Sequence, residues 1–359
     1  MGRAVTTEGE HVEDQRISGR RATLEDVARE AGVSLATADR VVNRREGVRG
    51  RTIARVEMAV AKLGYRANAA AMRLARNESY RFAFLLPSNA NSFMSNLSAQ
   101  VERASDWLAS QNGYIDMMHV DVFDPNALAE ALDRLSPDYH GIATVALDHT
   151  RVRAAIDDLV ARGVHVVTLV SDAPSSRRAH YVGVDNPAAG RTAASLMGRF
   201  LGGRKGKIGI IVGSMSLRDH AERHFGFHQV LSGEYPDLVA LPTGEGRDDR
   251  EQNSALTAAL LREHPDLVGL YNAGAGNEGI ASVLEASGRA RDIVWIAHEL
   301  TADARRFLLS GTIDAIINQD PGHEARSAAR ILLAHCLGDP IIPDQERIRI
   351  EIFVRDNLP

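Results

Sequence analysis

A short segment near the amino end brings one arginine together with several small polar side chains. Arg40 can offer its two-pronged guanidinium donor to the O6 and N7 atoms of a guanine. The hydroxyl and amide groups of Thr23, Ser34, Thr37 and Asn43 are suited to contacts with the phosphate backbone. Helix caps and turns use the same residue types in proteins that bind no nucleic acid. These residues therefore indicate a DNA-reading surface if a helix presents Arg40 to the major groove.

Two short helices joined by a glycine turn would present Arg40 in this way. Thr23 precedes an apolar periodicity, and Asp26 stands where the acidic partner of a capping box belongs, so a first helix begins here. Gly32 ends that helix, and Ser34 caps a second one. The second helix directs three apolar side chains inward, those of Ala38, Val41 and Val42. The pattern is a helix-turn-helix, in which the second helix reads the groove.

A third helix completes a small all-α domain. It is predicted from Thr52 to about Leu63, after the basic loop at residues 44–51, and Gly64 ends it. The DNA-binding domain is therefore placed at residues 22–67.

Charge is distributed unevenly along the 359 residues, of which 44% are hydrophobic and 25% charged. The formal net charge is -5. Residues 22–81 hold twelve Lys and Arg against seven Asp and Glu. Residues 1–21, predicted to be a disordered extension, are balanced, so residues 82–359 carry the negative excess. A basic head on an acidic body is expected of a DNA-binding module joined to a body that binds a small molecule.

Composition also bears on location and excludes several kinds of site. The sequence contains no run of eighteen apolar residues, which a membrane-spanning helix would need. The amino terminus lacks the charged segment followed by an apolar segment that marks a secretory signal. We therefore expect a cytoplasmic protein with no membrane partner. The single cysteine, Cys336, has leucine neighbours and is expected to be a core residue. We expect no metal site, no cofactor and no catalytic activity.

From residue 81 onward, short apolar runs alternate with longer helical stretches, which is typical of parallel sheets wrapped by crossover helices. Residues 81–359 are therefore predicted to form a two-lobed α/β body, the second lobe starting near residue 179 with a strand at Tyr181. A ligand is expected between the lobes at the carboxyl ends of strands. The predicted strands are residues 82–86, 114–120, 141–146, 164–170, 181–184, 207–212, 267–271, 293–297 and 313–317.

Two other motifs suggest alternative functions. Gly274 to Gly279 spells GxGxxG after a predicted strand, which would fit an NAD-dependent oxidoreductase, although it arises late in the second lobe. His220 and His224 stand four residues apart, but Ala221 takes the place of the catalytic glutamate of a zinc protease. Neither motif is specific enough to predict an enzyme.

The stretch TLEDVAREAGVSLATADRVVN at residues 23–43, followed by KLGYR at residues 62–66, resembles the signature of the lactose-repressor (LacI/GalR) family of bacterial transcription regulators. The resemblance implies that Leu35 and Ala36 face base edges, where apolar side chains favour thymine methyl groups. It supports the role of Arg40. Asp39 departs from the family pattern, which usually has a small hydroxyl residue at this position. A carboxylate near phosphates is repelled unless Arg40, Arg44 or another cation pairs with it.

The resemblance also implies a hinge helix within residues 68–80, for which a plain linker is the alternative. In the family, this helix is ordered when two subunits lie side by side on operator DNA. Asn68 lies at its start, and Leu74 matches the leucine that wedges into the minor groove. Ala67 replaces the usual proline.

The body of this family has a periplasmic sugar-binding protein fold, and the resemblance assigns its pocket to residues at strand ends. Asn, Gln, Arg and Asp can recognise hydroxyl groups along defined directions, while an aromatic ring covers an apolar sugar face. His298 stands where the family frequently has aspartate. The residues implied to bind the effector are Asn91, Phe93, Ser171, Asp172, Arg223, Asn272 (or Asn277), His298 and Gln319.

The resemblance implies a repressor whose operator affinity is controlled by a carbohydrate-like effector. The partners implied are double-stranded operator DNA, that effector, and a second copy of the chain in a homodimer or higher oligomer. Release by an inducer and binding with a corepressor both remain open. A secreted sugar-binding protein would share residues 82–359, but the helix-turn-helix argues against this alternative.

Overall fold

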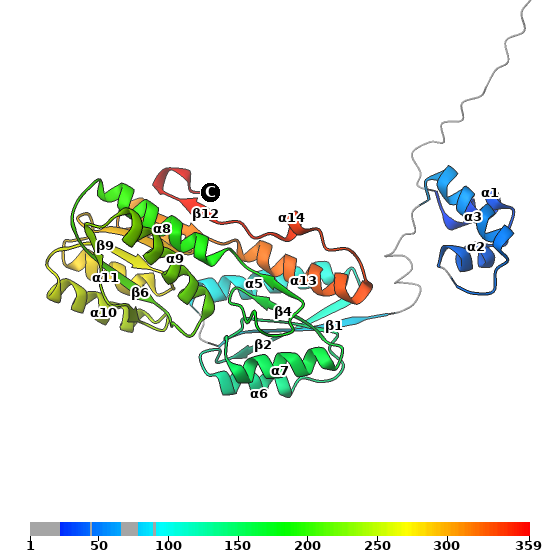
Figure 1. Cartoon of the computed structure of the whole chain (residues 1–359), viewed down its shortest axis with the longest axis horizontal. Coiled ribbons are helices and arrows are strands. Elements are labelled where there is room, and N and C mark those ends of the chain that lie inside the picture. The colour runs from blue at the N-terminus through cyan, green and yellow to red at the C-terminus, as the bar shows by residue number, and fades with distance from the viewer. Residues whose placement is uncertain (1–21, 44, 66–77, 89–90) are drawn as a thin grey trace, which may run out of the picture. The chain divides into compact units, whose positions relative to one another are not determined.

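The computed structural model describes residues 22–43, 45–65, 78–88 and 91–359. The chain divides into two units between residues 77 and 78, and each unit has its own hydrophobic core. The described part of the smaller unit is helical, and the larger unit combines two sheets with helices on both faces of each (Figure 1).

The small unit is a three-helix domain whose helices begin and end at the predicted signals. Thr23 and Asp26 form the capping box at the start of the first helix, Gly32 ends it with a φ of 59°, and the Ser34 side chain accepts a hydrogen bond from the Thr37 amide. Val27 and Val56 are fully buried in its core. The helices are α1 (Leu24–Ala31), α2 (Leu35–Val42) and α3 (Gly50–Leu63).

The third helix begins two residues before the predicted Thr52. Arg49 is its extended N-cap residue and makes no side-chain capping bond. The prediction missed this start because no capping side chain marks it, whereas the end at Gly64, with a φ of 58°, was correct.

The first lobe of the large unit is a five-stranded parallel sheet with the order β2-β1-β3-β4-β5. Helices α5 and α13 cover one face, and α6 and α7 cover the other (Figure 1). The strands are β1 (Tyr80–Pro87), β2 (Gly113–Val120), β3 (Gly141–Thr144), β4 (His165–Leu169) and β5 (His180–Val182). The helices are α5 (Ser92–Ala109), α6 (Pro125–Asp133), α7 (Thr150–Ala161) and α13 (Pro321–Leu337).

The second lobe has the strand order β12-β11-β10-β9-β6-β7, with β8 paired to β6 and β12 antiparallel to β11. Its strands are β6 (Gly206–Val212), β7 (Leu238–Ala240), β8 (Gly244–Glu245), β9 (Leu267–Asn272), β10 (Val294–His298), β11 (Ala315–Asn318) and β12 (Glu351–Phe353). Its helices are α8 (Asn186–Leu201), α9 (Arg218–Glu234), α10 (Arg250–Glu263), α11 (Asn277–Ala286) and α12 (Ala302–Ser310). The short elements α14 (Pro343–Glu346) and η1 (Arg355–Asn357) lie near the carboxyl end.

All nine predicted strands are present, but the strand at Tyr181 belongs to the first sheet, so it does not open the second lobe. Val167 pairs with His180 and Leu169 with Val182 across β4 and β5. The second sheet begins only at β6, after α8. The spacing of strands and helices could not reveal this, because it does not specify which sheet a strand joins. The prediction also missed β7, β8 and β12, which are two or three residues long.

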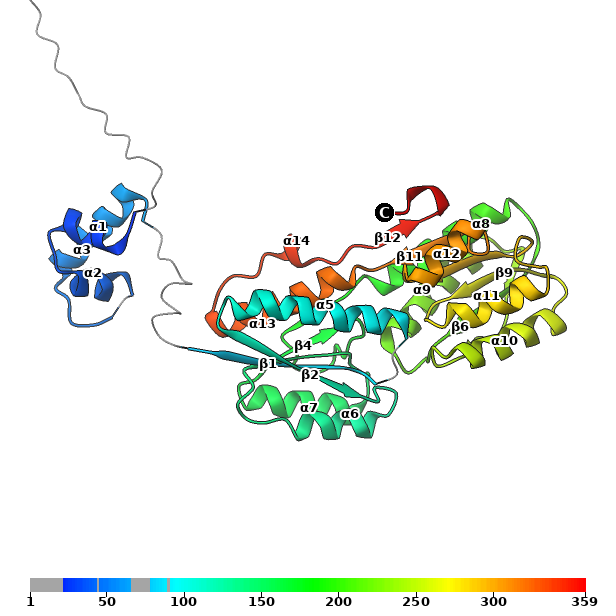
Figure 2. The same cartoon turned by 180° about the vertical axis from the view of Figure 1, so that it is seen from behind.

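The chain returns to the first lobe after β11, which the sequence pattern also did not reveal. Helix α13 buries Ala325, Ala328 and Leu332 in the core of the first lobe. Strand β12 then rejoins the second sheet. Because three segments cross between the lobes, each lobe is built from chain parts that are distant in sequence (Figure 2). No helix in the described part of the chain has the length and apolar character needed to cross a membrane.

Two glycines bring α8 and α9 into close contact. A Cβ added at Gly190 would overlap the carbonyl oxygen of Arg223, and one at Gly226 would overlap that of Pro187. Backbone therefore meets backbone at this crossing, which fixes the position of Arg223 relative to α8.

We expect Gly226→Ala to lower the free energy of unfolding by about 1–3 kcal/mol, because the added methyl group overpacks a backbone contact. Gly233→Ala on the same helix is the matched control, since its Cβ would meet nothing within 4 Å. The control should leave stability unchanged or raise it by up to about 1 kcal/mol. Chemical denaturation of the full chain measures both, and equal effects of the two substitutions would contradict the packing described.

Candidate functional site

Helix α2 presents a mixed apolar and cationic face in the small unit. Leu35, Ala36 and Arg40 are exposed, while Ala38 is fully buried against the other helices. Within the part of the chain that the structure describes, the guanidinium group of Arg40 makes no hydrogen bond or ion pair, although its backbone carbonyl accepts a hydrogen bond from the Arg45 amide. Its guanidinium group is therefore available to an external partner, as base recognition requires.

The polar residues predicted beside Arg40 take local roles in the fold. Thr23 and Ser34 are helix caps, and the Thr37 hydroxyl lies 2.8 Å from that of Ser34. Asn43 donates a 2.7 Å hydrogen bond to Asp39. These bonds orient the side chains without excluding phosphate contacts. The predicted residues Asn68 and Leu74 lie outside the described residues.

Asp39 is compensated by a cation. Arg45 Nη1 lies 3.3 Å from Asp39 Oδ2, so a cation other than Arg40 pairs with the carboxylate. The repulsion that an unpaired Asp39 would exert on phosphates is thereby reduced, and Arg40 keeps its donors.

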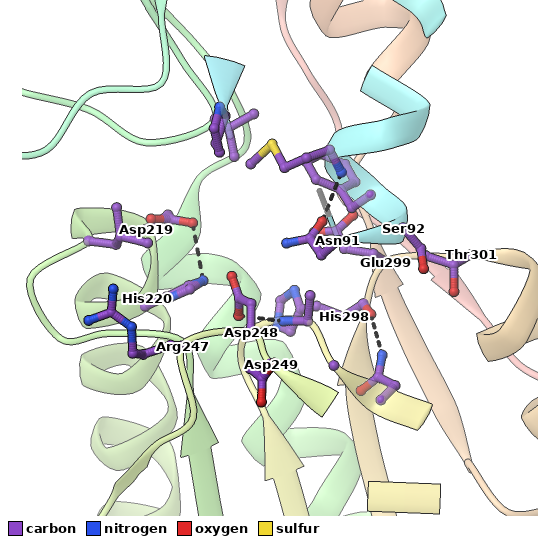
Figure 3. Close-up of a pocket in the computed structure, with 18 of the residues that line it drawn as sticks. Asn91, Ser92, Asp219, His220, Arg247, Asp248, Asp249, His298, Glu299 and Thr301 are labelled. Carbon is purple, nitrogen blue, oxygen red and sulfur yellow. Dashed lines mark hydrogen bonds and ion pairs between the residues drawn. The ribbon is translucent and has the colours of Figure 1, made fainter. Parts of the chain in front are cut away.

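In the large unit, a cavity of about 630 Å³ opens at the carboxyl ends of strands from both sheets. Its size falls in the range of small-molecule sites. The first lobe contributes Asn91, Phe93 and Ser171. The second contributes His220 and His298, which Figure 3 shows together with Asn91. The wall also includes Asp219, Arg247, Asp248, Asp249, Asn277, Glu299 and Thr301.

Five of the residues implied to bind the effector line this cavity. Asn91 caps α5 by accepting a 2.8 Å hydrogen bond from the Met94 amide, which leaves its amide nitrogen pointing into the cavity (Figure 3). Phe93 is buried beside it, and the hydroxyl of Ser171 has no partner in the described structure. Asn277 and His298 complete this group, and both are buried.

The other four implied residues do not line the cavity. Asp172 forms an ion pair with Arg178 and accepts a 2.6 Å hydrogen bond from Thr168. Asn272 holds the turn after β9 by bonding to Ala275 and Asn277. The strand-end rule placed both residues at the correct edge of a sheet, but it does not specify where a side chain points.

Arg223 and Gln319 are buried behind the cavity wall. Arg223 donates through Nε to Asn186 Oδ1 at 2.8 Å and through Nη1 to the Ala273 carbonyl at 3.0 Å. Its Nη2 lies 3.7 Å from Glu299 Oε1, to which Gln319 donates a 2.9 Å hydrogen bond. These two residues therefore position Glu299, which the sequence analysis did not select.

The sequence did not indicate the acidic residues of the cavity lining, chiefly Asp219, Asp248 and Glu299. Glu299 directly follows His298, but the backbone turns sharply there, with a φ of 67°, and brings both side chains to the site. Val170, Arg247 and Asp248 also line the cavity with positive φ values. Such strained conformations in non-glycine residues concentrate at functional sites.

The two lining histidines differ in their surroundings. His298 Nε2 lies 2.9 Å from the Tyr271 hydroxyl, and burial beside Arg223 holds its pKa well below the usual value, so the ring is neutral. His220 accepts a hydrogen bond from the Ser214 amide at Nδ1, which leaves the proton on Nε2, 3.6 Å from Asp219. Among the described residues, no group of three or more His, Cys, Asp or Glu side chains could hold a metal ion.

The lobes also touch near the cavity. Arg218 lies 3.2 Å from Asp148 across the two lobes, and the Arg247 guanidinium lies 5.1 Å from the centre of the Phe123 ring. These contacts depend on the angle between the lobes, so they would change if the cleft opened.

The glycines of the GxGxxG motif have a packing role. A Cβ at Gly274 would overlap Asp248, and one at Gly276 would overlap Asn253. Gly276 also has a φ of 75°. The side chains of Asp248 and Asn253 occupy the space over this turn, so the motif does not provide an open cradle for a pyrophosphate.

Comparisons with known proteins match both units. A model of the periplasmic binding protein domain matches residues 82–340, and a model of bacterial regulatory proteins of the lacI family matches residues 23–68. Of the solved structures, GanP, a glucose-galactose binding protein from Geobacillus stearothermophilus, is similar with a TM-score of 0.70 and 23% identity, covering 79% of this chain and 99% of that one. An ABC transporter solute binding protein from Burkholderia graminis, in complex with D-arabinose, is similar with a TM-score of 0.72 and 24% identity. The match covers 78% of this chain and 96% of that one.

Curated relatives match shorter segments. The ribose operon repressor of Escherichia coli is 39% identical over 83 residues, which cover 23% of this chain and 25% of that protein. The D-ribose/D-allose-binding protein of Pseudomonas aeruginosa is 29% identical over 152 residues, 40% and 45% of the two chains. The matching segments therefore span less than half the length of these relatives.

Burial in the cavity wall, with Asp219 nearby, raises the pKa of Glu299 to about 7 despite Arg223 and the hydrogen bond from Gln319. The neighbouring Glu324 on α13 also has a raised pKa, chiefly because of burial. In an unfolded chain a glutamate titrates near 4.3, so above that pH the unfolded state ionises freely while the folded state resists ionisation. The stability contributed by protonated Glu299 is therefore present at low pH and is lost as pH rises through about 7.

We expect Glu299→Gln to remove this dependence. Between about pH 5 and pH 8, the variant should gain about 2–3 kcal/mol in free energy of unfolding relative to the unsubstituted chain. Urea unfolding of the full chain measures the difference. The exposed Glu263→Gln substitution is the control, for which the difference should stay constant. A Glu299→Gln difference that does not change with pH would contradict the description.

Proposed function

Because the chain belongs to the lacI family of bacterial regulatory proteins, with a periplasmic binding protein domain as its large unit, we propose that it is a transcriptional regulator controlled by a small effector. The helix-turn-helix binds operator DNA, and the cavity binds a monosaccharide-sized polyhydroxylated compound. The observation that carries the proposal is the presence, in one chain, of an exposed Arg40 on α2 and a sugar-sized cleft cavity.

The chemistry of the exposed α2 face supports the DNA-binding half of the proposal. Arg40 reads a guanine, and Leu35 and Ala36 meet thymine methyl groups in the major groove. Thr23, Ser34, Thr37 and Asn43 are proposed to contact the backbone. Two copies of the chain bind as a homodimer, so that each small unit reads half of a roughly palindromic operator. The site of action is then the cytoplasm.

The cavity supports the effector half of the proposal. Asn91 offers an amide donor, the unpartnered Ser171 hydroxyl both donates and accepts, and Phe93 supplies an apolar surface. The Burkholderia graminis protein was solved in complex with D-arabinose, and this likeness favours a carbohydrate-like effector for this chain. The likeness to the ribose operon repressor favours a regulator.

Control of DNA binding follows from a difference in effector affinity between two arrangements of the lobes. Contacts such as Arg218 with Asp148 and Arg247 with Phe123 form only at one angle between the lobes. An effector that binds this arrangement more tightly shifts the population toward it. If the two arrangements hold the two DNA-binding units differently, effector and operator affect each other's binding reciprocally. If the arrangement that the effector favours binds DNA more weakly, the effector is an inducer. If that arrangement binds DNA more tightly, the effector is a corepressor.

We expect Arg40→Ala to weaken binding to a duplex selected from a random pool by about 10- to 100-fold, the value of a bidentate arginine-guanine contact. Binding to unrelated duplex should weaken less, because only charge is lost there. Arg262→Ala, which removes an exposed arginine from the large unit, is the control and should change neither affinity. Fluorescence anisotropy measures the affinity of the unsubstituted chain and of both variants for each duplex. An equal loss on both duplexes would remove Arg40 from base recognition.

A further inference from the structure

The inner wall of the cavity holds buried hydrogen-bond acceptors that have no partner among the described residues. They are Oδ1 of Asp219, Oε2 of Glu299 and the hydroxyl oxygen of Ser171. These three side chains belong to residues that are at most 5% exposed, and all three residues line the cavity. An unpaired buried acceptor is unfavourable, and most so when it is charged, so this wall is built to receive hydrogen-bond donors.

The charges along the described lining are unevenly placed. Its two arginines, Arg247 and Arg250, are both exposed residues, and Arg247 lies over the Phe123 ring. His298 is neutral because of burial. The carboxylates outnumber these cations and extend to the buried inner wall, and they belong to Asp219, Asp248, Asp249, Glu278, Glu299 and Asp303.

The buried cation behind the wall does not balance the carboxylates. Arg223 uses Nε and Nη1 for Asn186 and Ala273, and its Nη2 lies 3.7 Å from Glu299 without a hydrogen bond. The same guanidinium group also lies in the field of Asp219 and of the buried Glu324. Because burial raises the pKa of Glu324 well above its usual value, that group carries little charge, and the one buried guanidinium faces the carboxyl groups of Asp219 and Glu299. The inner end of the cavity therefore has no surplus of positive charge.

We propose that the effector is a cationic polyhydroxylated compound, an amino sugar or amino polyol, whose ammonium group is held by the buried carboxylates of the inner wall, Asp219 and Glu299 foremost. The inference rests on the proposed function, in that it assigns this cavity to the effector. The ammonium group supplies three donors and no acceptor, which suits a wall of unpartnered oxygens. Asn91, whose amide nitrogen points into the cavity, donates to a hydroxyl oxygen of the same molecule (Figure 3).

The state of Glu299 without an effector agrees with this assignment. Burial raises the pKa of Glu299 to about 7, so its carboxyl group is only partly ionised near neutral pH. A cation seated beside it would lower that pKa and complete the charge balance. Anionic compounds, such as sugar acids and sugar phosphates, would instead meet the carboxylates and are disfavoured.

Matched compounds that differ only in the amino group test the proposal. Isothermal titration calorimetry on the full chain near neutral pH compares D-glucosamine with D-glucose, D-galactosamine with D-galactose, D-mannosamine with D-mannose and glucamine with sorbitol. D-gluconate and D-galacturonate are the anionic probes. In at least one pair the amino compound should bind about tenfold tighter or more, as expected for a hydrogen bond between charged groups. The proposal is overturned if neutral or anionic compounds bind as tightly as the amino compounds, or if no amino compound binds.

Substituting a carboxylate by the amide of nearly the same shape tests whether Asp219 and Glu299 cause the preference for the amino compound. Glu299→Gln and Asp219→Asn should each reduce the preference for the amino compound about tenfold, because one carboxylate is lost at nearly constant shape. Glu263→Gln makes the same change at an exposed position on α10 and should leave the preference unaltered. If either isostere does not fold, the matched pairs on the unsubstituted chain still decide. An unaltered preference in both folded isosteres would overturn the assignment.

The same compounds separate this inference from the proposed function. If a neutral sugar binds the cavity more tightly than its amino counterpart and changes the affinity for a selected duplex, the proposed function is supported and the proposal of a cationic effector is wrong. If the amino compound binds tightly but the affinity for DNA does not change, the ligand class stands and effector control of DNA binding is wrong.

Discussion

The buried guanidinium of Arg223 is the interaction on which the cavity depends. It connects Asn186 at the start of α8, the Ala273 carbonyl after β9, and Glu299 after β10. The tight crossing of α8 and α9 at Gly190 fixes the backbone from which Arg223 extends. One charged group thereby ties together the segments of the second lobe that shape the inner wall. Loss of Arg223 would leave buried carboxyl groups without compensation, which is strongly unfavourable.

The small unit was largely predictable because its signals are local. Thr23 with Asp26, Gly32, Ser34 and Gly64 each set a helix boundary through their own hydrogen bonds or backbone conformation. The start of α3 at Gly50 lacks such a side chain and was predicted two residues too late. The strands of the body were predictable as apolar runs, but the sheet that β5 joins is decided by long-range pairing.

The location of the candidate effector site was predictable, but the set of side chains that line it was less so. Asn91, Phe93, Ser171, Asn277 and His298 line the cavity, as the strand-end rule and the family resemblance implied. Whether a side chain at a strand end faces a cavity or the interior depends on neighbours that a single sequence does not reveal. The missed Glu299 reaches the wall through a positive φ, which no sequence rule assigns to a glutamate.

Strain, buried charge and contact between lobes occur together in this cleft, and this combination suits a switch. Val170 and Glu299 hold unfavourable backbone conformations beside unpartnered polar atoms. An effector that satisfies those atoms stabilises the lobe arrangement in which they face each other, so its binding energy can act on the angle between the lobes.

Reciprocal linkage is the most direct test of the account. The affinity for a selected duplex is measured with and without saturating effector, and the affinity for the effector is measured with and without saturating duplex. The account predicts that both affinities change by the same factor, several-fold or more, in the same direction. Operator affinity that stays constant while the cavity is demonstrably filled would contradict it.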